Sequence, residues 1–215
     1  MVVCATLFWA GNFNIGKVAF IENIAPFTLA FLRWSLVWLI LIPFTYKEIF
    51  RLKKIIFKNF KLLFLLGLSS VFLYSALTYK ALNYTQVINA SLFNTAVPAT
   101  IILICFLLKI EKTNIFQLAG LLISTLGILA IVTRLDLNIL SSLDFNKGDL
   151  LMIIAIISWG VYSAFLKKRN FEISLLALIQ ITCSIGLILL APVFLIELNQ
   201  GHSVNMNINL LSILL

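Results

Sequence analysis

Long apolar runs separated by short polar connections dominate this sequence. A membrane-spanning helix needs about 20 consecutive apolar residues, and runs of that length occur near residues 2–20, 26–46, 60–82, 87–108, 116–133, 149–166 and 175–198. Hydrophobic residues make up 62% of the 215 positions and charged residues only 11%, against about 25% charged residues in soluble domains. We therefore predict an all-α membrane protein, folded as a polytopic helical bundle.

A further apolar run begins at Asn209 and reaches the last residue, Leu215. It is too short to cross a bilayer. From this run we expect the chain to be a fragment, or the product of a shortened gene.

The positive charges are concentrated in alternate connections between the apolar runs. Eleven of the sixteen Lys and Arg residues follow the second, fourth and sixth runs: Lys47, Arg51, Lys53, Lys54, Lys58, Lys61, Lys109, Lys112, Lys167, Lys168 and Arg169. Because cytoplasmic loops are enriched in Lys and Arg, this pattern predicts a multi-pass protein of the cell (inner) membrane with a cytoplasmic N-terminus. The net charge of +8 is thus explained by orientation in a lipid bilayer, and we expect no nucleic-acid partner.

Two parts of the chain resemble each other. Trp9 and Lys17 are eight residues apart, and so are Trp159 and Lys167, 150 positions further along. Pro43-Phe44 likewise has a near counterpart in Pro192-Val193-Phe194. A repeat of five spans has an odd number of crossings, so its second copy would run through the membrane in the opposite sense, as in many secondary transporters. The alternative is chance similarity among apolar helices.

Five motifs resemble, in order, those of the EamA family in the drug/metabolite transporter superfamily. They are LFWAGNFNIGKVAF, AFLRW, ALNYTQVINASLFNTAVPATIILICFLLKIEK, QLAGLLISTLGILAIV and GDLLMIIAIISWGVYSAFLKK. The resemblance implies ten helices in two inverted five-helix halves, with helices one, three, four and six lining a central path and helix five at the periphery. It assigns residues 1–134 to a complete first repeat and residues 149–215 to a partial second repeat.

The sequence offers no constellation typical of catalysis. His202 is the only histidine, and the eight Asp and Glu residues fall in connections or at the ends of the apolar runs. The three cysteines, Cys4, Cys105 and Cys183, lie inside apolar runs without paired spacing. We therefore expect no enzyme activity, no metal site and no cofactor.

Polar and aromatic residues inside the spans are the candidates for a substrate path. A hydroxyl or amide in hydrocarbon needs a partner, so it faces protein or a water-filled cavity. Pro98 should also bend its helix and free the carbonyl of Asn94. The candidates are Trp9, Asn12, Ser70, Tyr74, Thr78, Asn94, Pro98, Trp159 and Tyr162. The alternative is that these side chains only join helices within a rigid bundle.

The fifth run carries Gly120, Ser124 and Gly127 at helical spacing, with no amide or charge nearby. Small residues on one face let helix backbones approach closely in membranes. We therefore expect this helix to pack tightly against a neighbour and to make no contact with substrate.

Arg33 is the single charge within the apolar run that begins at Pro26. A central arginine costs about 2.5–3.5 kcal/mol on insertion scales, so it needs a partner or a function. With Lys17 and Lys80 it could form an electropositive vestibule for a carboxylate or phosphate group. Alternatively, Arg33 ties helix ends together by bonding carbonyls while the two lysines reach the headgroups, and we favour this structural role.

Together these features predict a secondary transporter that exports or exchanges a small-molecule metabolite by alternating access. The alternative is a non-transporting membrane scaffold or pseudo-transporter, including a chain that must form a homodimer to complete its core.

Overall fold

The computed structural model describes residues 2–111, 114–133 and 146–200, and these residues form helices without any strand. Five predicted spans are single helices: α1 (Val2–Ile21), α2 (Pro26–Arg51), α8 (Ile115–Thr133), α10 (Lys147–Lys167) and α11 (Leu175–Asn199). Within the described part of the chain, five segments are long and apolar enough to cross a membrane. The prediction of an all-α polytopic membrane protein is confirmed. The run that begins at Asn209 lies outside the described residues.

The third span changes its helical form midway. It begins as α4 (Phe60–Gly67), continues as the π-helical segment η1 (Leu68–Ser75) and ends as α5 (Ala76–Leu82). The hydroxyls of Ser69 and Ser70 donate to the carbonyls of Leu65 and Leu66, each over 2.6 Å. Such side-chain bonds compete with the backbone for the same acceptors. We take them as the local cause of the switch to the wider helix.

The fourth span is interrupted where the sequence predicts a bend. Its first part, α6 (Val87–Asn94), ends just before Thr95, and α7 (Val97–Leu107) begins with Pro98 in its first turn. Proline fits this position because the first turn of a helix needs no backbone N–H donor there. The two parts together still form one apolar segment of membrane-crossing length.

The connection between the second and third spans is helical, which the sequence analysis did not predict. The α2 helix continues to Arg51, and a short helix, α3 (Lys53–Lys58), follows directly. Residues 47–61 contain neither glycine nor proline, so nothing in this basic stretch breaks a helix.

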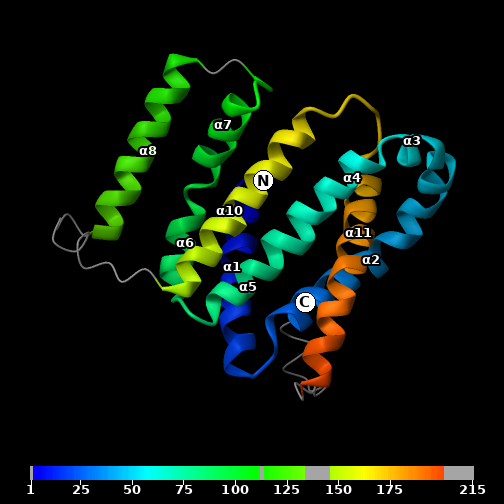
Figure 1. The fold of residues 1–215 in the computed structure, drawn as a ribbon, viewed down its shortest axis with the longest axis horizontal. Helices are drawn as coiled ribbons and strands as arrows, with labels where there is room; N and C mark the ends of the chain where they lie inside the picture. The colour runs from blue at the N-terminus through cyan, green and yellow to red at the C-terminus, as the bar shows by residue number, and fades with distance from the viewer. Residues whose placement is uncertain (1, 112–113, 134–145, 201–215) are drawn as a thin grey trace.

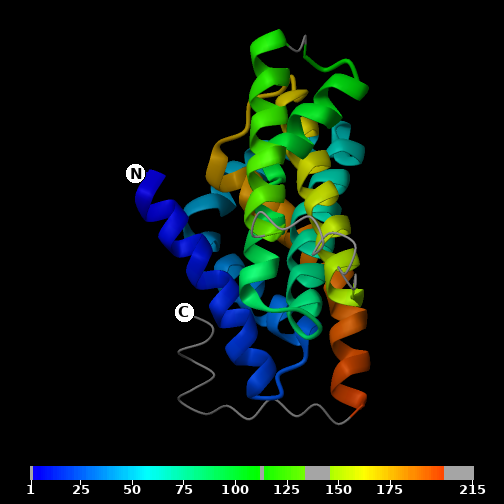
Figure 2. The same cartoon turned by 90° about the vertical axis from the view of Figure 1, so that its left-hand side faces the viewer.

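The α10 helix lies in the middle of the bundle and packs against α4, η1, α5, α6 and α7 (Figure 1). The α11 helix runs along α2 and also contacts α4 and η1. Small residues allow the closest approaches: a Cβ added to Gly67 would lie 2.8 Å from the Cβ of Ile185 on α11. The α1 helix leans away from the bundle toward its N-terminal end (Figure 2). These contacts surround the middle of α1, α2 and η1, where the candidate site lies.

The α8 helix lies at the edge of the bundle, beside α7 (Figure 1). The expectation that its small-residue face packs tightly is wrong for Gly120 and Gly127, because a Cβ added at either would meet no atom within 4 Å. The side chain of Ser124 is outside the described part. Since α8 touches the bundle along one side only, its glycines face away from the other described helices.

Candidate functional site

A cavity of about 410 Å³ lies between the helices near the middle of the spans. Its walls come from α1, α2, η1, α5 and α10, and combine a guanidinium, amide and hydroxyl groups with aromatic and aliphatic side chains. The lining residues are Asn12, Arg33, Trp34, Leu36, Val37, Ile40, Tyr74, Ser75, Tyr79 and Trp159. Ligand pockets in proteins have this mixed character, with an apolar wall and a few polar groups that fix orientation.

Three side chains from three helices form the polar part of the cavity. Arg33 on α2 donates through Nη1 to Asn12 Oδ1 on α1 and, over 2.8 Å, to Tyr79 Oη on α5. Tyr79 Oη in turn donates to Asn12 Oδ1 over 2.7 Å. Arg33 makes no further hydrogen bond within the described part of the chain, so no described residue accepts from its Nε and Nη2 donors. The triad joins three helices and still presents a positive charge to the cavity.

Aromatic rings form another part of the cavity wall. The ring of Trp159 on α10 is 4.6 Å from the Tyr74 ring and 5.0 Å from the Tyr162 ring, measured between centroids. Tyr74 Oη donates to Asn94 Oδ1 on α6 over 3.2 Å. On the α2 side, the indole of Trp34 donates to Ser75 Oγ over 2.9 Å. Rings held in this way offer flat apolar surface with little conformational freedom.

The π-helical turn decides which residues of the third span reach the cavity. The sequence analysis placed Ser70, Tyr74 and Thr78 on one face because they recur every four residues. In a π-helix the backbone bonds connect residues five apart, and the cavity is in fact lined by Tyr74, Ser75 and Tyr79. Ser70 instead bonds a carbonyl of its own helix. Thr78 is buried, and its hydroxyl has no hydrogen-bond partner in the described part of the chain.

The remaining candidates lie around the cavity. Asn94 does not line the cavity but accepts a hydrogen bond from the lining residue Tyr74. Tyr162 likewise contacts the lining residue Trp159. Pro98 is exposed in the first turn of α7. Trp9 belongs to α1, but its side chain is outside the described part. Four of the candidates from the sequence analysis, Asn12, Arg33, Tyr74 and Trp159, therefore line one cavity.

The two lysines considered with Arg33 have separate surroundings. Lys17 donates to the carbonyl oxygens of Leu82 and Thr85, over 2.9 and 3.1 Å, at the end of α5. It thus makes the helix-end carbonyl bonds that the sequence analysis assigned to Arg33. Lys80 lies over the ring of Phe27, 5.4 Å from its centroid. Neither lysine lines the cavity.

The second span supplies half of the cavity lining, although the sequence analysis considered only Arg33 from it. The others are Trp34, Leu36, Val37 and Ile40. Trp34 follows Arg33 directly, and a tryptophan beside a buried charge could have drawn attention to this turn. The aliphatic residues carry no such signal, because they look like any lipid-facing residue. Among the described residues no group of three or more His, Cys, Asp or Glu could hold a metal ion.

Comparisons with known proteins match this architecture. The profile of the EamA-like transporter family matches residues 1–133. An uncharacterized transporter of Archaeoglobus fulgidus is 32% identical over 193 residues, covering 89% of this chain and 65% of its own length. The uncharacterized transporter YyaM of Bacillus subtilis is 28% identical over 166 residues, covering 75% of this chain and 53% of its own length. No solved structure matches. The chain thus spans about half to two thirds of these relatives, and it belongs to the EamA-like transporter family.

Proposed function

We propose that this chain provides the substrate cavity of a secondary transporter, and that the cavity between α1, α2, η1, α5 and α10 binds a small amphipathic metabolite. The observation that carries the proposal is the pairing of the Arg33–Asn12–Tyr79 triad with the rings of Trp34, Tyr74 and Trp159 around about 410 Å³. Family membership supports a membrane transporter rather than an enzyme. The lining of the cavity supports a further inference about the chemical groups of the substrate.

The cavity favours a substrate with an apolar body and one electron-rich polar group. The apolar body would lie against Trp159 and Tyr74, whose rings are 4.6 Å apart. A carboxylate or a carbonyl would accept from the uncommitted donors of Arg33. The volume fits an amino acid or an organic compound of similar size, since small-molecule pockets start at about 300 Å³.

Alternating access is the mechanism that we propose for this transporter. The assigned repeats would be residues 1–134 and the partial repeat 149–215, so that α2 and α11 are counterparts. Two features support this pairing: α2 and α11 pack side by side, and each carries a proline within the helix, Pro43 and Pro192. Rocking of two inverted repeats about a central site would open the site to either side in turn.

Uptake into proteoliposomes tests the proposal. Purified protein is reconstituted and given a panel of labelled amino acids and amphipathic organic acids. We expect saturable uptake of at least one compound, and at least a tenfold loss of uptake for Trp159→Ala, which removes one wall of the cavity. The matched control is Phe116→Ala, an aromatic residue on α8 that is 80% exposed. Equal uptake by both variants would contradict the assigned cavity, and no uptake of any compound would favour a non-transporting scaffold.

A further inference from the structure

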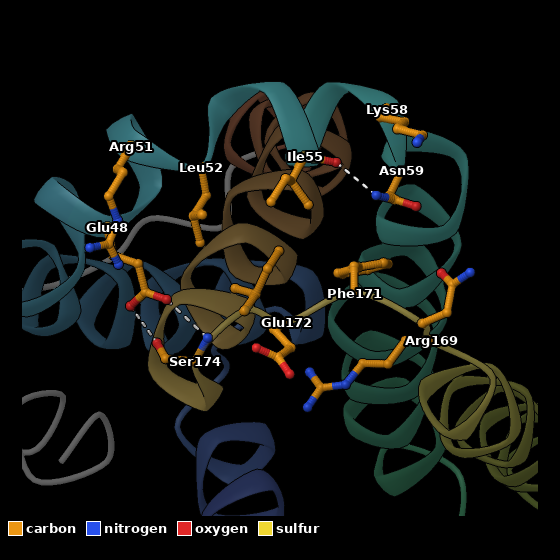
Figure 3. Close-up of a pocket in the computed structure, with 12 residues that line it drawn as sticks. Glu48, Arg51, Leu52, Ile55, Lys58, Asn59, Arg169, Phe171, Glu172 and Ser174 are labelled. Carbon is orange, nitrogen blue, oxygen red and sulfur yellow. Dashed lines mark hydrogen bonds between the residues drawn. The ribbon is translucent and has the colours of Figure 1, made fainter.

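A second, larger hollow of about 1100 Å³ lies where α2 ends and α11 begins, and Figure 3 shows the residues that line it. Its lining comes from residues 48–59 and 169–174, two segments that are far apart in the sequence. Four apolar segments end or begin beside it, at Arg51, Phe60, Lys167 and Leu175. The hollow therefore lies at the level where these spans leave the hydrocarbon, and we call it the basic pocket.

Positive charge predominates in the basic pocket. Arg51, Lys58 and Arg169 line it, together with the carboxylates Glu48 and Glu172. Glu48 is already engaged, because it accepts hydrogen bonds from the backbone N and the Oγ of Ser174, over 2.9 and 2.6 Å (Figure 3). These hydrogen bonds do not remove the charge of Glu48, so three cations and two carboxylates leave one excess positive charge in the lining. The pocket is thus suited to an anion.

Arg169 gives the clearest sign of a missing partner. Its Nη1 atom is buried and has no hydrogen-bond partner among the described residues. A buried donor of a charged group that lacks a partner is costly, and native structures pair almost all such groups. A ligand oxygen in the basic pocket would supply the acceptor.

The other walls of the basic pocket are apolar. Leu52, Ile55, Phe171 and Ile173 line it beside the cations. Just outside, the rings of Phe57 and Phe60 are 78% and 49% exposed, as expected of aromatic residues at the membrane interface. A freely soluble anion would make no use of this apolar surface, whereas an amphiphile would.

We propose that the basic pocket binds the phosphate headgroup of an anionic phospholipid, with Arg169 Nη1 as a direct donor to a phosphate oxygen. The apolar wall would hold the glycerol and the first carbons of the acyl chains. This face of the bundle carries the Lys- and Arg-rich connections, which the positive-inside rule assigns to the cytoplasm, and anionic lipids attract basic segments there. The bound lipid would join the α2–α3–α4 connection to the segment between α10 and α11.

Native mass spectrometry of the purified chain in a neutral detergent tests this site. Dioctanoyl phosphatidylglycerol is titrated against dioctanoyl phosphatidylcholine, and inorganic phosphate is added as a competitor. We expect selective binding of phosphatidylglycerol and a loss of affinity of about fivefold for Arg169→Gln, the effect of one charge near a membrane surface. The matched control is Lys54→Gln, an exposed cation on α3 that does not line the pocket.

Arg51→Gln provides a second variant in case Arg169→Gln does not fold, because Arg51 is exposed and lines the same pocket. We expect it to weaken phosphatidylglycerol binding also, while Lys54→Gln leaves binding unchanged. Equal losses in the pocket and control variants would overturn the proposal in favour of general surface charge. Equal binding of phosphatidylcholine, or displacement by equimolar inorganic phosphate, would likewise overturn it. The test does not depend on transport, so it is independent of the proposed function.

Discussion

Arg33 has a structural role that its position in an apolar helix alone does not specify. Its Nη1 atom holds Asn12 and Tyr79, which stabilises the contact of α2 with α1 and α5. Its remaining donors are directed at no other described residue. The guanidinium thus joins helices by hydrogen bonds to side-chain oxygens. The sequence analysis expected bonds to helix-end carbonyls instead.

The first prediction concerns this triad. Lysine is a compact point charge and cannot reproduce the planar fork of arginine, so we expect Arg33→Lys and Arg33→Gln both to lower the free energy of unfolding. A hydrogen bond to a charged group contributes about 1.5–3 kcal/mol, and thermal unfolding in detergent would measure the loss. Lys47→Gln, an exposed cation on the same helix, serves as control. Normal stability of Arg33→Gln, with a loss of uptake confined to anionic substrates, would instead make Arg33 purely a substrate contact.

Glu197 is a buried carboxylate whose role the sequence did not reveal. The first turn of α2 has Ala25 as its N-cap, which offers no side-chain acceptor. Glu197 near the end of α11 takes that place, accepting from the backbone N and Oγ of Thr28 over 2.7 and 2.9 Å, and from the backbone N of Phe27 over 3.3 Å. A negative charge at a helix N-terminus is stabilising.

The second prediction follows from this cap. We expect Glu197→Gln to lower the free energy of unfolding by about 1–2 kcal/mol, because the amide keeps an acceptor but loses the charge. Thermal unfolding in detergent would measure it. Glu22→Gln, an exposed acid in the connection between α1 and α2, should have no comparable effect. A Glu197→Gln variant as stable as this control would show that the cap does not depend on charge.

At the scale of elements, the interruptions of helices determine the shape of the site. The π-helical segment η1 contributes Tyr74 and Ser75 to the cavity, and α5, which follows it, contributes Tyr79. The break between α6 and α7 ends α6 at Asn94, the residue that accepts from Tyr74. Irregular helical turns in membrane proteins are tolerated where protein or a water-filled cavity satisfies the freed backbone groups.

The third prediction concerns the break in the fourth span. Pro98 clashes with a continuous helix at the carbonyl of Asn94, four residues earlier, and alanine would remove that clash. We expect Pro98→Ala to extend α6 into α7, displace Asn94 from Tyr74 and change uptake kinetics several-fold, with little change in expression. Uptake measured beside membrane protein yield would separate the two effects. Wild-type uptake kinetics in this variant would show that the break between α6 and α7 does not contribute to transport.

At the scale of the whole molecule, the positions of the charges are consistent with a single orientation in the membrane. Lys54 and Lys168 lie at the end of the bundle that carries the basic pocket, where α2 ends and α11 begins. Glu22 lies at the opposite end, in the connection between α1 and α2.

The fourth prediction tests this orientation by cysteine labelling. Lys54→Cys and Lys168→Cys should react with a membrane-impermeant reagent only from the cytoplasm, and Glu22→Cys only from outside. The native cysteines are first replaced, although Cys105 and Cys183 are buried. Labelling of position 54 from outside intact cells would reverse the topology.

The sequence by itself determined the spans and the family. Span length and hydropathy are local properties of a chain in a bilayer, so apolar runs predict membrane helices within a few residues. The break near Pro98 is also local, because proline lacks a backbone donor. Only the tertiary structure decided which polar residues share a cavity. Ser70 and Thr78 were expected to face it, but the π-helical turn directs Tyr79 there instead. The capping of α2 by Glu197 depends on a helix about 170 residues away, and such a contact forms only when α11 packs against α2.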